Sequence, residues 1–197
     1  NQGAQDAAAE LGDVEVIYTG PTSATAEAQI EVVNSLIAQQ VDAIAISAND
    51  PDALVPVLQR AMQRGIKVVS FDSGVAPEGR QIHLNPSDID LIGETIIKLA
   101  ADYLPEGGDV AILSAASTAT NQNAWIEAMK VEWQKPEYAN MPLVATVYGD
   151  DQDDKSYREM QALVKAHPNL KGVISPTTIG IRAGAKAIMD EGLVGQV

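Results

Sequence analysis

Residues Gln40–Gly74 read QVDAIAISANDPDALVPVLQRAMQRGIKVVSFDSG and contain one complete repeat of the pattern that runs through the chain. Two short β-rich runs, 43–47 and 67–71, flank a longer segment, 51–64, whose apolar residues recur at helical spacing. A strand, a helix and a second strand joined by short loops are typical of a βαβ unit, in which the two strands lie parallel in one sheet. The stretch therefore predicts an α/β fold built on parallel sheets.

The same alternation extends in both directions from this unit over almost the whole chain. Each half shows the same order of strand, loop and helix, which predicts two similar Rossmann-like α/β lobes in tandem. Further strands are expected at 14–19, 81–84, 110–115, 144–148 and 172–175, and further helices at 24–39, 86–103, 122–135, 155–166 and 179–191.

A break in this pattern falls at 104–108, where Pro105, Gly107 and Gly108 precede a new strand. Such residues are typical of linkers between domains. We therefore expect an N-terminal α/β lobe over 1–104, a hinge crossover over 105–108, and an incomplete C-terminal α/β lobe over 109–197.

Both ends of the chain are abrupt. Asn1 leads directly into an Ala-rich, helix-like stretch that runs to Leu11, so the expected first strand is missing and any export signal has been removed or is not recorded. Residues 194–197 read like the beginning of another strand. The sequence is therefore interpreted as a fragment of a longer protein.

Composition indicates a globular chain for which nucleic acid and anionic membrane surfaces are poor partners. The 197 residues are 46% apolar and 20% charged, and their formal net charge of −14 comes without any run of Lys or Arg. That charge repels a phosphate backbone. The absence of cysteine excludes disulfides, thiol catalysis and thiolate metal ligands.

Polar residues follow most of the predicted strands. In open parallel sheets, ligands bind beyond the carboxyl ends of the strands. Carboxylates and amides pair well with vicinal hydroxyls, and each unpaired buried polar group costs about 1 to 3 kcal/mol. The lining is therefore typical of a sugar site rather than an ion site. The positions concerned are Asn49 and Asp50, Asp72 and Ser73, 117–122, 149–151 and 176–178.

Asp72 is the strongest single candidate for a ligand-binding residue, because it follows a predicted buried strand and would place a carboxylate at the carboxyl end of that strand. A turn or N-cap aspartate is an equally good interpretation of Asp72 alone. Asn121 and Gln122 form an adjacent amide pair after a Ser/Thr-rich loop, for which a helix-capping loop is the simpler interpretation. Trp125 could stack on a sugar ring, although its helical spacing with Met129 favours a place in the core.

The sequence contains no motif for a calcium loop, for a histidine-based catalytic triad or for phosphate binding. The acidic run at 150–154 lacks the spacing of a calcium loop, since Lys155 falls where an oxygen ligand is needed. His83 and His167 have no Ser or Asp partner nearby in sequence, and no glycine-rich phosphate-binding motif is present. We therefore expect no catalytic residues, no metal and no cofactor.

Particular strings in this chain resemble the type I periplasmic sugar-binding proteins of ABC transporters. The first is 40–74 as quoted above, with its strand-end aspartate; the second is PNLKGVISP at 168–176; and the third is TATNQNAW at 118–125. The third string is similar to the branch that contains rhamnose-binding proteins and receptors for autoinducer-2. With 19–39 and 147–159, the closest resemblance is to rhizobial rhamnose-binding proteins.

This resemblance implies a Venus-flytrap protein whose two lobes, joined by three crossovers, close on one sugar and present it to a membrane-embedded ABC permease. It also implies a periplasmic location, a monomer and no enzymatic activity. The residues that match the family's sugar contacts are Asp72, Asn121, Gln122, Pro176, Thr178 and, less closely, Asn49.

The ligand and the class of protein both have alternatives. Autoinducer receptors carry aspartate where this chain has Asn121, and the lost carboxylate favours a deoxysugar such as rhamnose. The same lobes also serve as effector domains of LacI-type regulators, which would need an upstream DNA-binding segment. A sugar-modifying enzyme is a third possibility, for which no catalytic pair around Asp72 is readable.

Overall fold

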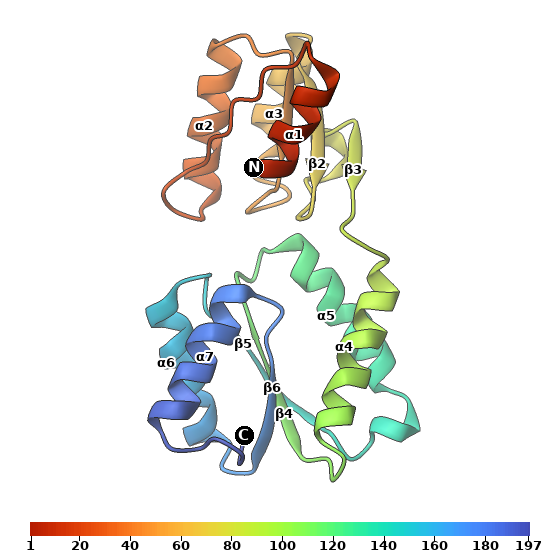
Figure 1. Cartoon of the computed structure of the whole chain (residues 1–197), viewed down its shortest axis with the longest axis vertical. Coiled ribbons are helices and arrows are strands. Elements are labelled where there is room, and N and C mark those ends of the chain that lie inside the picture. The colour runs from red at the N-terminus through yellow and green to blue at the C-terminus, as the bar shows by residue number, and fades with distance from the viewer.

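The computed structural model describes residues 1–197 and shows two α/β lobes stacked along the long axis of the molecule (Figure 1). Each lobe holds a three-stranded parallel sheet, with strand order β1-β2-β3 in the first and β5-β4-β6 in the second. The strands are β1 Ala43–Ile46, β2 Lys67–Phe71, β3 Ile82–Leu84, β4 Asp109–Ser114, β5 Leu143–Tyr148 and β6 Leu170–Ile174. The helices are α1 Gln2–Leu11, α2 Ala26–Ala38, α3 Val55–Gln63, α4 Ile89–Tyr103, α5 Thr120–Trp133, α6 Asp153–Ala166 and α7 Thr178–Asp190, with short 3-10 turns at Pro77–Gly79 and Pro136–Tyr138. The expected α/β fold with parallel sheets is confirmed.

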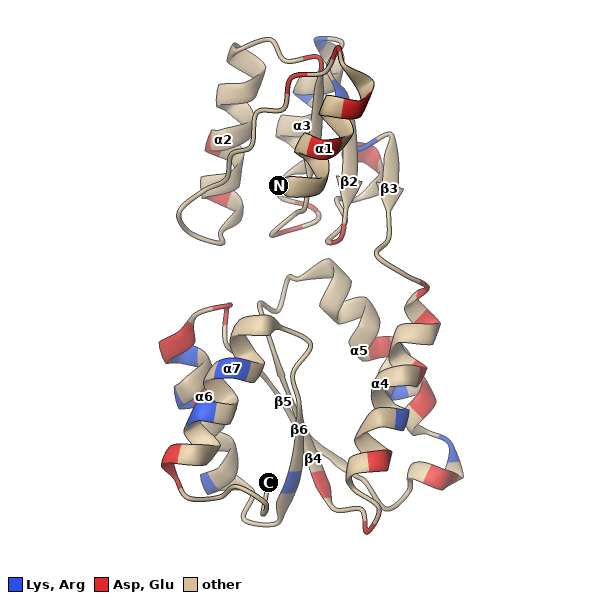
Figure 2. Ribbon diagram, viewed as in Figure 1, with Lys and Arg blue, Asp and Glu red and all other residues tan.

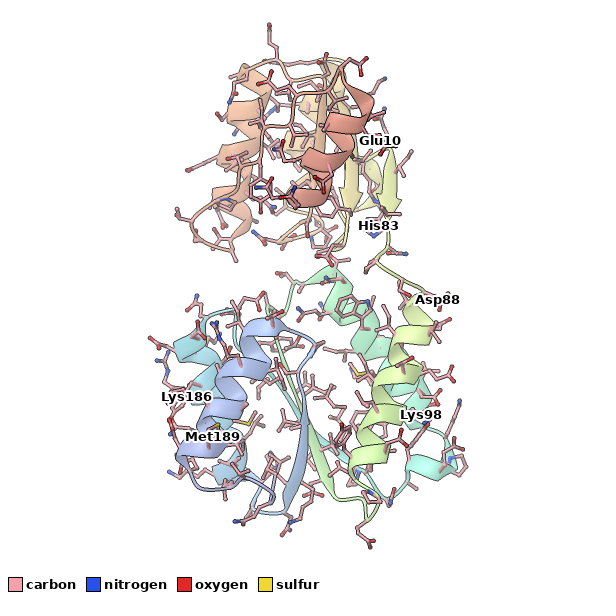
Figure 3. All side chains as sticks on the ribbon, in the orientation of Figure 1. Glu10, His83, Asp88, Lys98, Lys186 and Met189 are labelled. Atoms are coloured by element: carbon pink, nitrogen blue, oxygen red, sulfur yellow. The ribbon has the colours of Figure 1, made fainter.

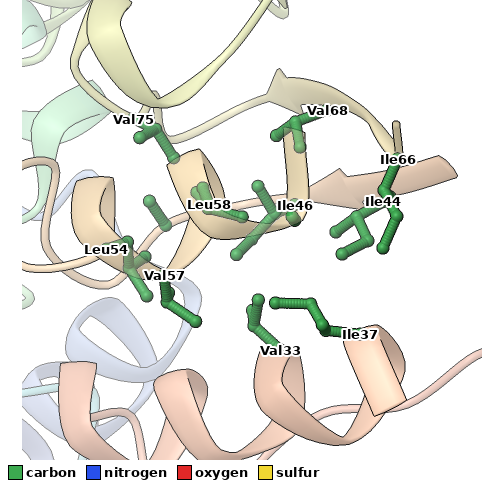
Figure 4. Close-up of a cluster of buried hydrophobic side chains, with 12 residues drawn as sticks. Val33, Ile37, Ile44, Ile46, Leu54, Val57, Leu58, Ile66, Val68 and Val75 are labelled. Atoms are coloured by element: carbon green, nitrogen blue, oxygen red, sulfur yellow. The ribbon is translucent and has the colours of Figure 1, made fainter. Parts of the chain in front are cut away.

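The core of the N-terminal lobe lies between one face of its sheet and the pair α2 and α3 (Figure 4). Val33 and Ile37 from α2 and Leu58 from α3 pack there against Ile44 and Val68 of the sheet. Alternate residues of β1 are buried and exposed, as a strand with one covered face requires. This packing holds the carboxyl ends of β1 and β2 in fixed positions.

The sheet of the C-terminal lobe is covered on both faces (Figure 1). Helices α4 and α5 cover one face, where Val110 and Ile112 of β4 are buried. Helices α6 and α7 cover the other, where Ala111 and Leu113 are buried. Because both faces are covered, β4 is a continuous apolar run rather than an alternating one.

The boundary between the lobes does not lie at 105–108 as expected, because α4 packs in the C-terminal lobe. Ile97 of α4 is fully buried in the same core as Val110 and Met129, so α4 belongs to the C-terminal lobe. Gly107 and Gly108 have positive φ and form the turn from α4 into β4 inside that lobe. The chain instead passes from one lobe to the other at 85–88. In Figure 3 the label His83 lies just before this segment and the label Asp88 marks its end.

Two expected strands are absent. Residues 14–19 are extended but form no backbone hydrogen bond with β1, and Ile17 and Tyr18 are 51% and 70% exposed. A strand is defined by a hydrogen-bonded neighbour, and residues 14–19 have none. Residues 194–197 form a turn after α7 rather than the start of a strand. The other expected strands and helices are confirmed, with ends that coincide or differ by up to four residues.

None of the helices combines the length and the hydropathy that a membrane span requires.

Candidate functional site

The carboxyl ends of the strands in the two lobes face each other, and the segments that follow β2 and β4 come into contact. Asn121, in the first turn of α5, donates from Nδ2 to Oδ1 of Asp72, which follows β2, over 2.8 Å. These residues are 49 positions apart in the chain and lie on opposite lobes. The two candidates that the sequence singled out separately are thus brought together.

Asp72 stands at the centre of this contact. Its backbone is left-handed, with φ of 55°, and this turns the chain sharply after β2. Asparagine and aspartate adopt that conformation more readily than other non-glycine residues. The second carboxylate oxygen, Oδ2, accepts from the hydroxyl of Ser47 over 3.1 Å. Asp72 is therefore held from both lobes and remains exposed to solvent.

The loop after β1 is fixed by a side chain from α2. Gln29 donates from Nε2 to the carbonyl of Ser47 over 2.6 Å, and its Oε1 accepts from the backbone N–H of Asn49 over 2.9 Å. Both polar ends of one amide thus hold the backbone on either side of Ala48. The Asn49 side chain is half-buried and faces the same cavity as Asp72 and Ser47.

Gln122 lines the cavity between the lobes and also forms hydrogen bonds inside its own lobe. Its Oε1 accepts from the Ser114 hydroxyl and from the Ala115 backbone N–H, both at 2.8 Å. Because the oxygen is occupied, only the amide nitrogen is free to meet a ligand. Its neighbour Asn121 is not the N-cap of α5, which is Ala119, but Oδ1 of Asn121 accepts from the first-turn N–H of Gln122 over 2.7 Å.

The segment after β5 lines the smaller of the two cavities described below, and the segment after β6 bonds to it through Thr177. Asp150 and Asp151 follow β5 with φ of 52° and 49°, and Asp150 pairs with Lys155 over 2.5 Å. The buried hydroxyl of Thr177 donates to Oδ1 of Asp151. Neither Pro176 nor Thr178, which flank Thr177, lines either of the two main cavities. The structure therefore brings Asp72, Asn121, Gln122 and Asn49 together without these two.

Two cavities lie on either side of the Asp72–Asn121 hydrogen bond, and both residues line both cavities. The smaller, about 140 Å³, lies over the strand ends, and its lining is largely polar. The larger, about 320 Å³, lies beside the crossover at 85–88. Its lining includes Trp125, His83 and Arg80. The half-buried Trp125 therefore faces a cavity between the lobes rather than the core alone.

His83 has two partners that its position in the sequence did not reveal. Its Nδ1 is hydrogen-bonded to Oγ of Ser70, and its Nε2 to Oδ1 of Asn85, both over 2.8 Å. Ser70 is only 1% exposed within β2, so no substrate reaches its hydroxyl. The arrangement ties β2 to the start of the crossover and is not a nucleophilic triad.

Ser47, Gln29 and His83 are the residues of this region that the sequence analysis missed. Ser47 ends a predicted strand next to Asn49, and that position was the only available signal for it. Gln29 bonds to Ser47 and Asn49 and His83 bonds to Ser70 over separations of 13 to 20 residues, at which no sequence pattern operates, although the other partner of His83, Asn85, is two residues away. No three His, Asp or Glu side chains are placed to hold a metal ion.

Each of the two α/β lobes has a parallel sheet, and a polar cleft lies between the facing carboxyl ends of the strands. This is the arrangement of a type I periplasmic binding protein, which the sequence predicts. The chain belongs to the family of periplasmic binding protein domains, whose model matches residues 1–197.

Three relatives illustrate the range within this family. A solute-binding protein of an ABC transporter from Clostridium phytofermentans, solved with bound L-rhamnose, is 43% identical with a TM-score of 0.92 and covers 95% of this chain. A solute-binding protein from Burkholderia graminis in complex with D-arabinose is 29% identical with a TM-score of 0.85 and covers 96%. A D-ribose/D-allose-binding protein from Pseudomonas aeruginosa is 29% identical over 86% of the chain.

The chain spans 59%, 65% and 54% of the length of these three proteins, respectively.

Proposed function

We propose that this chain is the ligand-binding part of a periplasmic sugar-binding protein, which takes one monosaccharide between its lobes and delivers it to a membrane-embedded ABC permease. The observation that carries the proposal is the meeting of Asp72 and Asn121 from opposite lobes at the strand ends. In this proposal, the protein is a monomer that catalyses nothing and needs neither a metal nor a cofactor.

The chemistry of the cleft supports a neutral polyol. Asp72 offers carboxylate oxygens as acceptors, while Asn121 and the amide nitrogen of Gln122 offer donors. In the smaller cavity, Asn49 and Ser47 add further small polar groups. A sugar hydroxyl both donates and accepts, so it can insert between Asp72 and Asn121 in place of their direct bond.

L-rhamnose is the first ligand to test. The relative solved with L-rhamnose is the most similar in sequence of the three described above, whereas one of the others was solved with D-arabinose and the other is named for D-ribose and D-allose. Asn121 supports a deoxysugar, because an amide supplies one acceptor fewer than the aspartate of autoinducer-2 receptors. Autoinducer-2 is the alternative ligand within this class, and a LacI-type effector domain is the alternative role.

A thermal-shift screen of the complete protein that carries this chain tests the proposal. The panel holds L-rhamnose, other deoxyhexoses, D-ribose, D-arabinose, D-allose and autoinducer-2, with Asp72→Asn as the control variant. A sugar present at 100 times its Kd adds about 2.7 kcal/mol to the stability and raises the midpoint by several degrees. We expect that shift with L-rhamnose and a smaller shift in the control variant at the same sugar concentration.

A shift with autoinducer-2 alone would assign the protein to the receptor branch and would reverse the inference from Asn121. No shift across the panel would contradict the transport function and favour the regulator.

A further inference from the structure

The contact between the lobes is concentrated on one short segment, residues 118–121. Thr118 donates from Oγ1 to the carbonyl of Asn49, and Thr120 donates from Oγ1 to the carbonyl of Gly74, both over 3.0 Å. With the Asn121–Asp72 bond, these make three cross-lobe hydrogen bonds. No other hydrogen bond or ion pair joins residues 1–84 to residues 89–197.

Thr118 and Thr120 differ from Asn121 in their relation to the cleft. Asn121 lines the smaller cavity, but neither threonine does. Thr118 is exposed, and the half-buried Thr120 lines only the larger cavity beside the crossover. The threonine hydroxyls therefore act between the lobes without a place in the polar cleft where we propose that the sugar binds.

The acceptors and the donors of these two hydrogen bonds are held in place by contacts within their own lobes. The acceptors are backbone carbonyls, and the loop that carries Asn49 is fixed by Gln29. On the other lobe, Asn123 donates to the carbonyl of Ser117 over 2.8 Å and shapes the turn that leads into α5. Little freedom is lost when the hydroxyls bind, so the bonds contribute to holding the lobes together.

We propose that Thr118 and Thr120 form a latch that raises the closed fraction of the protein in the absence of sugar, and that they are positioning residues for binding. The inference rests on the proposed function. If the sugar is retained only in the closed form, its apparent Kd equals the intrinsic Kd divided by the closed fraction. The latch thus raises affinity through residues that do not touch the sugar, and it slows dissociation because opening breaks both bonds.

The test compares the complete wild-type protein with the Thr118→Val/Thr120→Val variant, since valine keeps the shape of threonine and removes the hydroxyl. Thr95→Val is the matched control, because Thr95 is exposed on α4 and its side chain has no hydrogen-bond partner. Closure without ligand is followed by energy transfer between labels on cysteines introduced at Gln63 and Lys165, exposed positions on opposite lobes of a cysteine-free chain. Binding of L-rhamnose is followed by stopped-flow tryptophan fluorescence, to which Trp125 contributes from the lining of the larger cavity.

We expect the double variant to show lower energy transfer without sugar and a Kd for L-rhamnose that rises about tenfold, or about 1.4 kcal/mol. The rise should come from faster dissociation, with the association rate and the ligand-free unfolding midpoint unchanged. Equal energy transfer in wild type and variant, or a Kd within twofold of wild type, would overturn the latch. If no sugar binds the wild type, the proposed function fails, and the energy-transfer comparison still decides the latch.

Discussion

Left-handed aspartates mark the candidate site at the scale of single residues. Four non-glycine residues have positive φ, and three of them, Asp72, Asp150 and Asp151, follow strands and line the smaller cavity. Residues held in this sparsely populated conformation cost free energy and cluster at ligand sites. Their position at the cleft supports the view that the loops are shaped for binding rather than for stability.

Asp72→Asn should weaken sugar binding without loosening the fold. Asparagine tolerates the left-handed conformation of Asp72, with φ of 55°, but its side chain has one acceptor oxygen instead of two. We expect Kd, measured by isothermal titration, to rise about 5- to 100-fold, while the ligand-free midpoint stays near that of wild type. Asp154→Asn, an exposed change in the first turn of α6, is the control. Wild-type affinity in Asp72→Asn would remove this carboxylate from the site.

The candidate site residues that the sequence could predict are polar residues that follow a strand or begin a helix. Asp72 and Asn121 were found in this way, and the structure joins them. Whether Asn121 served a helix or a partner could not be decided, because its partner lies 49 positions away. For Gln122, a structural role and a ligand-binding role each describe part of the side chain. Its oxygen is hydrogen-bonded within the lobe, and its nitrogen is not.

At the scale of elements, the close contact of α4 and α5 determines to which lobe α4 belongs. A Cβ on Gly93 would lie 2.6 Å from the backbone carbonyl carbon of Ala128 and 2.7 Å from the nitrogen of Met129. Both distances are shorter than atoms can approach, so only glycine fits there. The sequence could not show this, since the break at 105–108 looks the same whether it joins two lobes or turns within one.

Gly93→Ala should therefore destabilise the protein. Forcing a methyl group into a packed interface costs about 1 to 3 kcal/mol, which lowers the unfolding midpoint by about 2 to 10 °C for a chain of this size. Circular dichroism on heating measures the change. Gly3→Ala is the control, because nothing lies within 4 Å of the added Cβ in α1 and alanine favours helix. Equal midpoints for the two variants would contradict the packing of α4 on α5.

Helices α6 and α7 are joined at the surface by Asp190. Its carboxylate accepts from Lys186 over 2.5 Å and from Tyr157 of α6 over 2.9 Å. These bonds, that of Lys186 foremost, lower the pKa of Asp190 below its ordinary 3.8 and raise the pKa of Lys186. A carboxyl group whose pKa is lowered by folding stabilises the protein above its ordinary pKa and loses this effect as pH falls through the folded value.

Asp190→Asn should therefore reduce the unfolding midpoint at neutral pH, and the difference from wild type should shrink as pH falls below 3.8. Midpoints measured from pH 7 to pH 2 follow this change. The control is Glu106→Gln, an exposed carboxylate with no side-chain partner. A difference between Asp190→Asn and wild type that persists at pH 2 would contradict an electrostatic origin.

The elements that the sequence predicted correctly are those whose pattern is local. Strands β1, β2 and β4 are short apolar runs and α4 is strongly periodic, so their existence follows from burial. Residues 14–19 have the composition of a strand but no neighbour to bond. A strand depends on its partner, and a sequence pattern cannot show whether that partner is present.

For the whole molecule, closure is the motion that the narrow contact at 118–121 allows. One crossover at 85–88 and three hydrogen bonds leave the lobes free to rotate when those bonds break. We expect small-angle scattering of the complete protein to show a smaller radius of gyration with saturating L-rhamnose than without it. D-mannitol, an open-chain polyol, serves as the control. An unchanged radius with a sugar that binds would contradict a flytrap.

The free edge of β1 has a consequence for the behaviour of this chain in solution. Within the 197 residues, β1 pairs only with β2, so in a solution of this chain alone its outer row of N–H and carbonyl groups can pair with β1 of a second copy. Two copies that approach in this way each carry a formal charge of −14, and Figure 2 shows Asp and Glu residues, in red, distributed over both lobes. Repulsion between copies weakens as salt shortens the Debye length from about 30 Å at 0.01 M to about 3 Å at 1 M. Solutions of the 197-residue chain should therefore scatter more light as sodium chloride is added, and a lysine in place of Ala45 should suppress that rise.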